Sequence, residues 1–556
     1  MAERFEHHAR LMTVLTLVSR VTGLVRDAAL ARVFGVGPLM DAFNLAFLIP
    51  NLFRRLFGEG AISAAFVPRY AELERDDPAQ ARRYSGLLLA LLAAVLWGIV
   101  IVGELFLLSR WLASPPIEFT RTPPMMFAGV MVESMSVSYV RLGYELTALM
   151  LPYMPLVCLT AVAGSALQVH GRFGPTAASP IILNIALIAA TLGVLPLVHA
   201  GGVSAETHLR IVAGAVLVAG VLQLWWTFAA LRAVKPVFAP RDPAAWASVR
   251  ATMVQTLPMM LGLGVLQINT AIDGLIASWP TVVGPTIFGF DYPLATGAMS
   301  AMANAQRLYE FPLGVFGISI ATAVFPLLAR QNNDMAAFAG TVRRALRLTV
   351  FIGLPASAGL VVLARDAAGA FFRGGAFDAE DVRRVAFVVI GFAPAIWSYQ
   401  MNHVFTRAFY ALKEPMVPVK VSVAMVVLNL ALNVTLIFTP LREAGLAWST
   451  AICSVLQVAI LGRLLARRVP GIVDREVLLS WRSTAIAAAV MTVAVLAAER
   501  MLPDVDRWSI YTLRLGTGVV VGMAAFFAIA ALLGMPEVRE VLRRGGRGGA
   551  APPQQP

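Results

Sequence analysis

The run MDAFNLAFLIPNLFRRLFGEGAISAAFVP, from Met40 to Pro68, decides the fold, because it is apolar enough to cross a membrane and still carries arginine in its middle. Arg54 lies in this run, Arg20 and Arg26 lie in the apolar stretch before it, and Arg307 lies in the eighth such stretch. Each arginine costs roughly 2.5–3.5 kcal/mol to place at a bilayer centre. A chain that keeps several such charges either pairs them internally or lines a polar cavity with them.

The composition is that of a polytopic membrane protein. Of the 556 residues, 58% are hydrophobic and only 14% are charged, and the mean hydropathy is +0.74. A soluble protein carries about 25% charged residues. Since a helix needs about 20 residues to cross the bilayer, we expect an all-α fold with about fourteen transmembrane helices. The candidate spans are roughly 10–34, 40–68, 84–113, 143–169, 177–199, 208–233, 251–279, 298–327, 342–364, 382–411, 417–439, 443–466, 481–500 and 509–534.

Basic residues set the expected orientation, because arginine and lysine stay on the cytoplasmic side. They gather in connections that follow an even-numbered span, namely those after spans 2, 6, 8 and 12. In that order the residues are Arg69, Arg75, Arg82 and Arg83; Arg232, Lys235, Arg241 and Arg250; Arg330, Arg343 and Arg344; and Arg463, Arg467, Arg468, Arg475 and Arg482. Both termini should therefore be cytoplasmic. The connection between spans 9 and 10 departs from the pattern, with Arg365, Arg373, Arg383 and Arg384.

The net charge of +13 is mostly this topology signal. We therefore expect no nucleic-acid partner, although the C-terminal RRGGRGGAAPPQQP resembles an RNA-binding arginine-glycine segment. Residues 535–556 are expected to form a disordered cytoplasmic tail.

Internal similarities recur six helices apart. VLQLWWTFAALRAVKP (221–236) matches VLQVAILGRLLARRVP (455–470), and LNIAL from Leu183 matches LNLAL from Leu428. Because six is even, the copies share an orientation and should be related by an axis along the membrane normal. We expect two six-helix repeats, 10–233 and 251–466, around a central cavity, with two further transmembrane helices at 481–534.

The membrane-depth arginines are candidates for substrate binding. A guanidinium fork matches phosphate oxygens two at a time, so a cavity lined by Arg20, Arg26, Arg54 and Arg307 would select phosphate-bearing anions. The alternative is an internal salt-bridge network, for which the chain supplies fewer acids than arginines. The residues expected to gate or to pair charges are Asp27, Asp41, Arg55, Glu59 and Glu310. Of these, Arg55 and Glu59 are spaced i,i+4 and favour a structural pair.

A second group combines Asp273 with Asn429, Asn433 and Ser449. An intramembrane carboxylate beside neutral oxygens suits a sodium ion or a proton. Hydrogen bonding between helices through asparagine explains the same residues equally well, so both readings stay open.

Signatures of enzymes are missing from the sequence. It contains no Walker loop, its six histidines form no metal-spaced set beyond an N-terminal pair, and Cys158 and Cys453 lie in apolar stretches. There is no pattern of a cleavable signal peptide. We expect no catalysis and no cofactor. The energy source is then an ion gradient with a coupling cation, the membrane potential, or consumption of the product.

These motifs resemble the MurJ (MviN) family of lipid II flippases, in the multidrug/oligosaccharidyl-lipid/polysaccharide exporter superfamily. The matching segments are SRVTGLVRDAALARVFG from Ser19, the run 40–68, GRFGP at Gly171 and QRLYEFPLGVFG from Gln306, and similarity extends over about residues 8–470. The resemblance implies flipping of the undecaprenyl-diphosphate-linked peptidoglycan precursor from the cytoplasmic to the periplasmic leaflet of the bacterial inner membrane. The two repeats then suggest alternating access around a shared site.

The resemblance also assigns roles to residues. Arg20, Arg26, Arg54 and Arg307 correspond to the family's essential cavity arginines, Asp41 to its essential acid at the periplasmic end of helix 2, and Asp27, Glu59 and Glu310 to further family positions. Helices 13 and 14 would hold the lipid tail in a groove. The implied partners are lipid II, membrane lipids and cell-wall synthesis enzymes.

Two alternatives and one departure remain. The chain could export another lipid-linked oligosaccharide or drugs, or it could be a non-transporting scaffold for cell-wall enzymes. The segment 114–142 is longer and more apolar than the family pattern, and we expect a periplasmic re-entrant or interfacial piece there.

Overall fold

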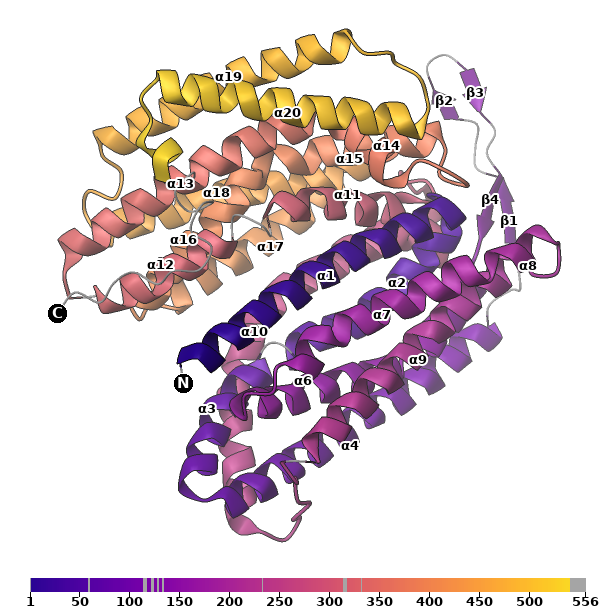
Figure 1. Ribbon diagram of the computed structural model, residues 1–556. Coiled ribbons are helices and arrows are strands. Elements are labelled where there is room, and N and C mark those ends of the chain that lie inside the picture. Colours follow the sequence, from indigo (N-terminus) through magenta and orange to yellow (C-terminus); the bar gives the residue numbers. More distant parts are fainter. Residues whose placement is uncertain are drawn as a thin grey trace. The chain divides into compact units, whose positions relative to one another are not determined.

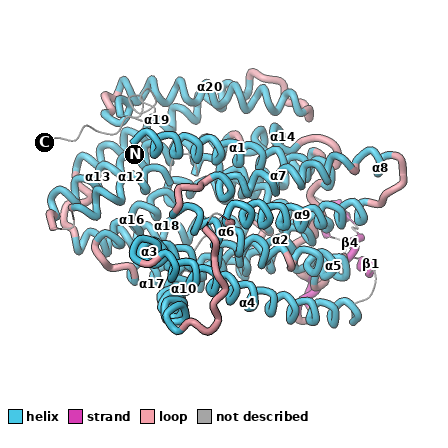
Figure 2. The backbone as a smooth tube through the Cα atoms, turned by 60° about the horizontal axis from the view of Figure 1, so that its bottom comes forward, coloured by secondary structure: helices cyan, strands magenta, loops and turns pink. Residues whose placement is uncertain are grey.

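The computed structural model describes residues 2–58, 61–113, 118–121, 125–127, 130–132, 135–232, 234–313, 318–331 and 333–540. Helices make up nearly all of this backbone (Figure 2). Ten helical segments of the described chain are long and apolar enough to cross a membrane. They confirm a multi-pass, all-α membrane protein. These segments are Pro78–Ala113, Val140–Val169, Gly174–His199, Ala205–Leu231, Met335–Val362, Ala379–Ala411, Met416–Leu436, Glu443–Arg468, Arg475–Arg500 and Trp508–Leu532.

The ten segments match ten of the expected spans one to one. The four other expected spans correspond to α1 (Ala2–Phe34); to α2 (Pro38–Phe53), the π-helical turn η1 (Arg54–Gly58) and α3 (Ala61–Asp76); to α10 (Pro243–Val282); and to α11 (Ala298–Pro312) with α12 (Ile318–Arg330). Each of these four carries at least one charged residue predicted to function.

The first compact unit comprises Met1–Ser300 with Gly375–Phe377. Besides α1, α2, α3 and α10, it contains α4 (Pro78–Ala113), α5 (Val140–Met150), α6 (Tyr153–Val169), α7 (Gly174–Gly193), α8 (Leu195–His199) and α9 (Ala205–Leu231). In this unit α1 packs on α7 and α7 packs on α9, as Figure 1 shows. The largely buried α6 packs against α3, α4 and α9, and forms the centre of the core.

The unit boundary differs from the boundary of the expected repeats, which fell between residues 233 and 251. Packing places α10 in the first unit because it contacts α2, α3 and α4. One such contact is the 2.6 Å hydrogen bond between the hydroxyls of Tyr84 in α4 and Thr252 in α10. The repeats themselves therefore stay a prediction about symmetry, and do not describe the packing units.

The second unit comprises Ala301–Gly374 and Asp378–Pro556. After α11 and α12 it contains α13 (Met335–Val362), α14 (Ala364–Phe372), α15 (Ala379–Phe392), η3 (Ala393–Ala395), α16 (Ile396–Ala411), α17 (Met416–Leu436), α18 (Glu443–Arg468), α19 (Arg475–Arg500) and α20 (Trp508–Leu532). The last two lie side by side (Figure 1), and α19 packs along α13. The rings of Phe351 in α13 and Phe526 in α20 lie 5.1 Å apart at their centroids.

The segment after α4 forms strands, and no helix is described there. Strand β1 (Glu118–Arg121) pairs antiparallel with β4 (Met135–Ser138), and β2 (Met125–Phe127) pairs antiparallel with β3 (Val130–Val132). Along the sequence, the β2–β3 pair lies between the two strands of the β1–β4 pair. At its base the Arg141 guanidinium lies 3.8 Å from the ring centroid of Trp111, whose indole N–H donates to Glu145. Between α10 and α11, β5 (Thr286–Ile287) pairs with β6 (Phe290–Asp291).

The arginines that departed from the charge pattern have structural partners. Arg365 bonds to Asp504 at 3.1 Å, and Arg373 bonds through two nitrogens to Asp506, at 2.9 and 2.8 Å. Both acids lie in the connection between α19 and α20. Arg383 pairs with Glu380 one turn earlier, and Arg384 pairs with Glu443 at the start of α18, at 2.5 Å. Arg365, Arg373 and Arg384 thus join different segments of the second unit, which gives them a role other than setting topology.

Two buried carboxylates share one arginine beside these pairs. The Arg514 guanidinium in α20 donates to Asp366 in α14 at 2.9 Å and to Glu499 at the end of α19 at 2.5 Å. Asp366 is 3% exposed and Glu499 is 9% exposed. Burial, together with the nearby Glu499 carboxylate, raises the pKa of Asp366 to about 7, although Arg514 opposes this. The pair Asp366 and Glu499, here called the shared-arginine pair, thus favours one bound proton near neutral pH.

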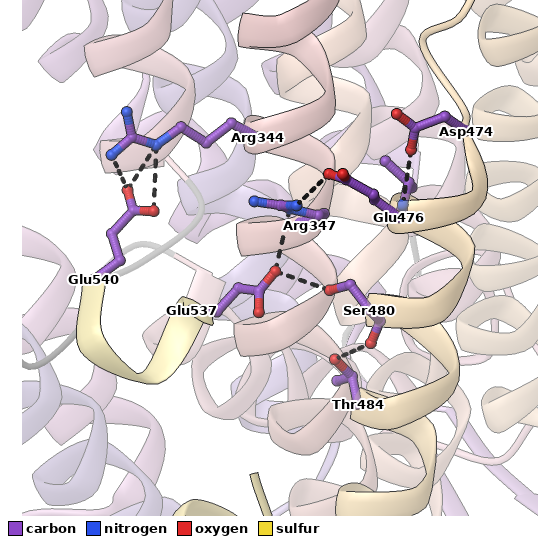
Figure 3. Close-up of polar contacts among 9 residues, drawn as sticks. Arg344, Arg347, Asp474, Glu476, Ser480, Thr484, Glu537 and Glu540 are labelled. Atoms are coloured by element: carbon purple, nitrogen blue, oxygen red, sulfur yellow. Dashed lines mark hydrogen bonds and ion pairs between the residues drawn. The ribbon is translucent and has the colours of Figure 1, made fainter. Parts of the chain in front are cut away.

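The opposite end of α19 and α20 is fastened by the chain's C-terminal segment (Figure 3). Residues 536–540 form a short helix in which the Glu537 carboxylate lies 3.2 Å from Nε of Arg347 and accepts a hydrogen bond from Ser480 at 3.0 Å. Glu540 accepts hydrogen bonds from Arg344. The expectation of disorder is therefore wrong for 535–540, because these acids find arginines of α13. Residues 541–556 of that expected tail lie outside the described chain.

We expect the shared-arginine pair to make stability depend on pH. The folded protein binds a proton at Asp366 up to about pH 7, whereas the unfolded chain binds it only below about pH 4. Stability should therefore fall as the pH rises from about 4 to 7, and then level off. Asp366→Asn should flatten the dependence of Tm on pH between about pH 5 and 7, measured by thermal unfolding of the purified protein in detergent.

The matched control is Asp506→Asn. The hydrogen bond from Arg373 holds the pKa of Asp506 below its usual range, so this acid does not titrate in that window. The control should lower Tm and keep the slope. An unchanged slope in Asp366→Asn would contradict the assignment.

The C-terminal contacts should differ in strength. Glu537 is buried, and removing one partner of a buried pair costs about 3 kcal/mol. Glu540 pairs with an Arg344 side chain that is 60% exposed, so its loss should cost less than about 1 kcal/mol. Comparison of denaturant unfolding of Glu537→Ala and Glu540→Ala should show this order. Equal losses would mean that the buried pair does not anchor the segment.

Candidate functional site

Arg26 is the most buried of the candidate arginines. Its side chain is 11% exposed, and its Nε and Nη2 donate to Asp27 Oδ1 at 2.8 and 2.6 Å. Its Nη1 donates to the side-chain oxygen of Asn184 in α7 at 3.0 Å. The carboxylate and the amide thus hold the guanidinium from two sides. Arg20, nearly two turns earlier in α1, is exposed.

Arg54 and Arg55 open the π-helical turn η1, which follows α2 directly. The Arg54 Nε donates to Asn51 at 3.3 Å, and Pro50 lies inside α2 just before it. A π-turn widens the helix and is frequent at functional sites. Arg55 is exposed, and its expected partner Glu59 lies outside the described residues. That pair therefore stays a prediction.

Arg307 lies in the second unit, whereas Arg20, Arg26 and Arg54 lie in the first. Its Nη1 is 3.4 Å from Glu310 one turn later, and both side chains are 43% exposed. An exposed pair of this kind contributes about 0–1 kcal/mol, so Glu310 does not hold Arg307 firmly. A cavity shared by all four arginines stays a prediction.

Asp41 is fully buried and supports a helix N-terminus. Its carboxylate accepts hydrogen bonds from the backbone N–H of Gly297 at 2.6 Å and of Ser300 at 2.8 Å, and from the Thr281 hydroxyl at 3.0 Å. Gly297 and Ser300 flank the start of α11, where unpaired N–H groups carry partial positive charge. In this structure the N-terminus of α11 supplies the positive charge that faces the Asp41 carboxylate. The expectation that Asp41 pairs with a basic side chain stays a prediction.

The second predicted group is brought together in part. Asn429 donates to Ser449 at 3.2 Å, Asn433 donates to Asn429 at 2.9 Å, and Ser449 also bonds to Asn433. All three are buried. Asp273 lies in the first unit, where it accepts from Asn269 at 3.1 Å. Among the described residues, no group of three or more His, Cys, Asp or Glu could hold a metal ion.

Several polar partners of these residues were not predicted from the sequence. Asn184 lies in the repeated LNIAL motif, and Thr281 and Asn269 belong to no predicted group. A polar side chain in an otherwise apolar membrane helix was the available signal for all three.

A family model described as lipid II flippase MurJ matches residues 30–512 of this chain. Curated relatives agree. The chain is 30% identical to the probable lipid II flippase MurJ of Haemophilus influenzae, over 89% of this chain and 92% of that protein. It is 30% identical to the one of Rhizobium tropici over 95% and 94%, and 28% identical to the lipid II flippase MurJ of Burkholderia cenocepacia over 82% and 83%.

Solved structures show the same fold. A lipid II flippase MurJ in an inward closed conformation superposes with a TM-score of 0.74 at 21% identity, covering 96% of this chain and 100% of that one. An inward-facing multidrug resistance transporter of the MATE family, in the MOP superfamily, superposes with a TM-score of 0.63 at 12% identity, covering 83% and 98%. The architecture is that of these membrane transporters.

Proposed function

The chain belongs to the MurJ family of lipid II flippases, and from that premise we propose that it moves lipid II from the cytoplasmic to the periplasmic leaflet of the bacterial inner membrane. The observation that carries the proposal is the family match across 30–512. The buried, doubly held Arg26 gives it a chemical basis, because a guanidinium at membrane depth suits the diphosphate of the lipid carrier. We place Arg20, Arg54 and Arg307 in the same cavity, and both chain termini in the cytoplasm.

We propose alternating access as the transport cycle. A diphosphate and its sugars cannot cross hydrocarbon exposed, so they need a cavity that opens to one leaflet at a time. The second expected span passes from α2 into the π-helical turn η1 at Arg54. Interrupted helices mark the substrate sites of many transporters. Asp41 would close the outer gate through its bonds to the start of α11.

We propose two alternative energy sources for transport. An excess of positive charge in the cavity couples to membrane potential at about 2.3 kcal/mol per charge per 100 mV. A cation bound near Asn429, Asn433, Ser449 and Asp273 would couple to a sodium or proton gradient instead. Transport by vesicles in which the potential and the ion gradient are set separately decides between them.

We expect Arg26→Ala to reduce lipid II transport about a hundredfold while the protein remains in the membrane, because charge-assisted hydrogen bonds to the diphosphate are lost. Arg26→Lys should restore little, since an ammonium keeps the charge but not the fork. Transport is measured in vesicles that contain purified protein and labelled lipid II.

The matched control is Arg467→Ala, an exposed arginine of an expected cytoplasmic connection, which should transport normally. Normal lipid II transport in Arg26→Ala would exclude the assigned role of Arg26. If wild-type vesicles do not move lipid II at all, the two alternatives are favoured, namely an exporter of other substrates and a non-transporting scaffold.

The outer gate is tested by a disulfide. Asp41 Oδ1 lies 2.8 Å from the Ser300 nitrogen, so the two residues are in contact and a disulfide between cysteines at these positions is the test. The native Cys158 and Cys453 are buried and should not interfere. Oxidation of the Asp41→Cys, Ser300→Cys protein should stop transport, and reduction should restore the level seen before oxidation. Transport at the unoxidised rate with the cross-link verified would defeat alternating access at this gate.

A further inference from the structure

Asn184 makes three hydrogen bonds to one face of α1. Its oxygen accepts from Arg26 Nη1 at 3.0 Å, and its nitrogen donates to the Ser19 carbonyl at 3.1 Å and to the Thr22 hydroxyl at 3.1 Å. Residues 19, 22 and 26 share a face because they are spaced by three and four. One amide thus joins two turns of α1 to α7, and it is only 4% exposed.

The amide holds Arg26 in a way that Asp27 alone does not. Asp27, the next residue of the same helix, accepts from the Nε and Nη2 edge of the guanidinium. Asn184 takes Nη1 on the other side, from a different helix. Contacts on both sides fix the plane of the guanidinium, so the remaining N–H groups point in a set direction.

The chemistry of the contact also suits anion binding. A carboxylate at position 184 would add a second negative charge beside Arg26 and compete with a phosphate. A neutral amide restrains the guanidinium and leaves its charge uncancelled. The Asn184 side-chain NH2 group donates to Ser19 and Thr22 of α1. The amide therefore cannot rotate by 180° and present this NH2 group to the arginine.

We infer that Asn184 is a positioning residue, which orients the Arg26 guanidinium to receive the diphosphate of a polyprenyl-linked substrate. This inference rests on the proposed function. It assigns to Asn184 a role in affinity, in addition to the helix packing that a buried asparagine always supports.

The test is a double-mutant cycle on the dissociation constant for undecaprenyl diphosphate, measured with the purified full-length protein in nanodiscs. The cycle compares wild type, Asn184→Ala, Arg26→Ala and the double variant. Asn184→Ala should weaken binding about tenfold, as expected for loss of a hydrogen bond to a charged group. In the Arg26→Ala background the same change should weaken binding no further, because there is no guanidinium left to orient.

Two further variants separate positioning from packing. Asn184→Asp keeps an acceptor for Arg26 but adds charge, so it should bind the diphosphate more weakly than Asn184→Ala. Gln223→Ala removes another buried amide that ties α9 to α7, through its 2.7 Å hydrogen bond to the Ser179 carbonyl. This control should lose thermal stability and keep the wild-type dissociation constant.

The outcomes distinguish the inference from its premise. If Arg26→Ala binds like wild type, the proposed role of Arg26 fails and the inference fails with it. If Arg26→Ala binds weakly but Asn184→Ala binds like wild type, or if the two losses add, only the inference is overturned, and Asn184 is a packing residue. Should Asn184→Ala not fold, binding by Asn184→Asp as tight as wild type would overturn the inference equally.

Discussion

A charged group inside a membrane must find its partners within the protein, because lipid offers none, and the rest of this structure depends on that constraint. Arg26 is held by Asp27 and by an amide from a second helix. Asp41 is held by the backbone at the start of α11. Each of these sets of contacts joins two segments of the chain at a fixed place. The charges that cost most free energy to bury therefore also specify how the helices pack.

The same constraint separates two kinds of helix. Ten segments of the described chain are apolar and serve mainly to span and to pack. The helices that hold the charged candidate residues include α1, α2 and α11, and α2 passes into the π-turn η1 at Arg54. A continuous α-helix satisfies its own backbone, whereas an interrupted one exposes polar groups that line a cavity or bind a ligand. Charge and a change of helix type thus occur together at Arg54.

The sequence predicted the spans well, because hydropathy over twenty residues is a local property. It predicted partners poorly, because these come from afar: Arg26 and Asn184 are 158 residues apart, and Asp41 and Ser300 are 259 apart. Composition also predicted disorder at 535–540, because the segment is polar. In the structure Glu537 and Glu540 pair with arginines of α13, which order this segment. The arginines of the 9–10 connection looked anomalous for the same reason. The acids that pair with Arg365 and Arg373 lie in a connection more than a hundred residues later.

Fastening α19 and α20 by ion pairs at both ends has a consequence for how this part of the chain can evolve. The pairs around Arg514 at one end and Arg347 at the other fix the sliding register of the two helices against α13 and α14. Register is then independent of the apolar residues between the two ends. Those residues can diverge to suit membranes of different acyl composition or thickness, and the anchors would keep the helices in alignment while they do so.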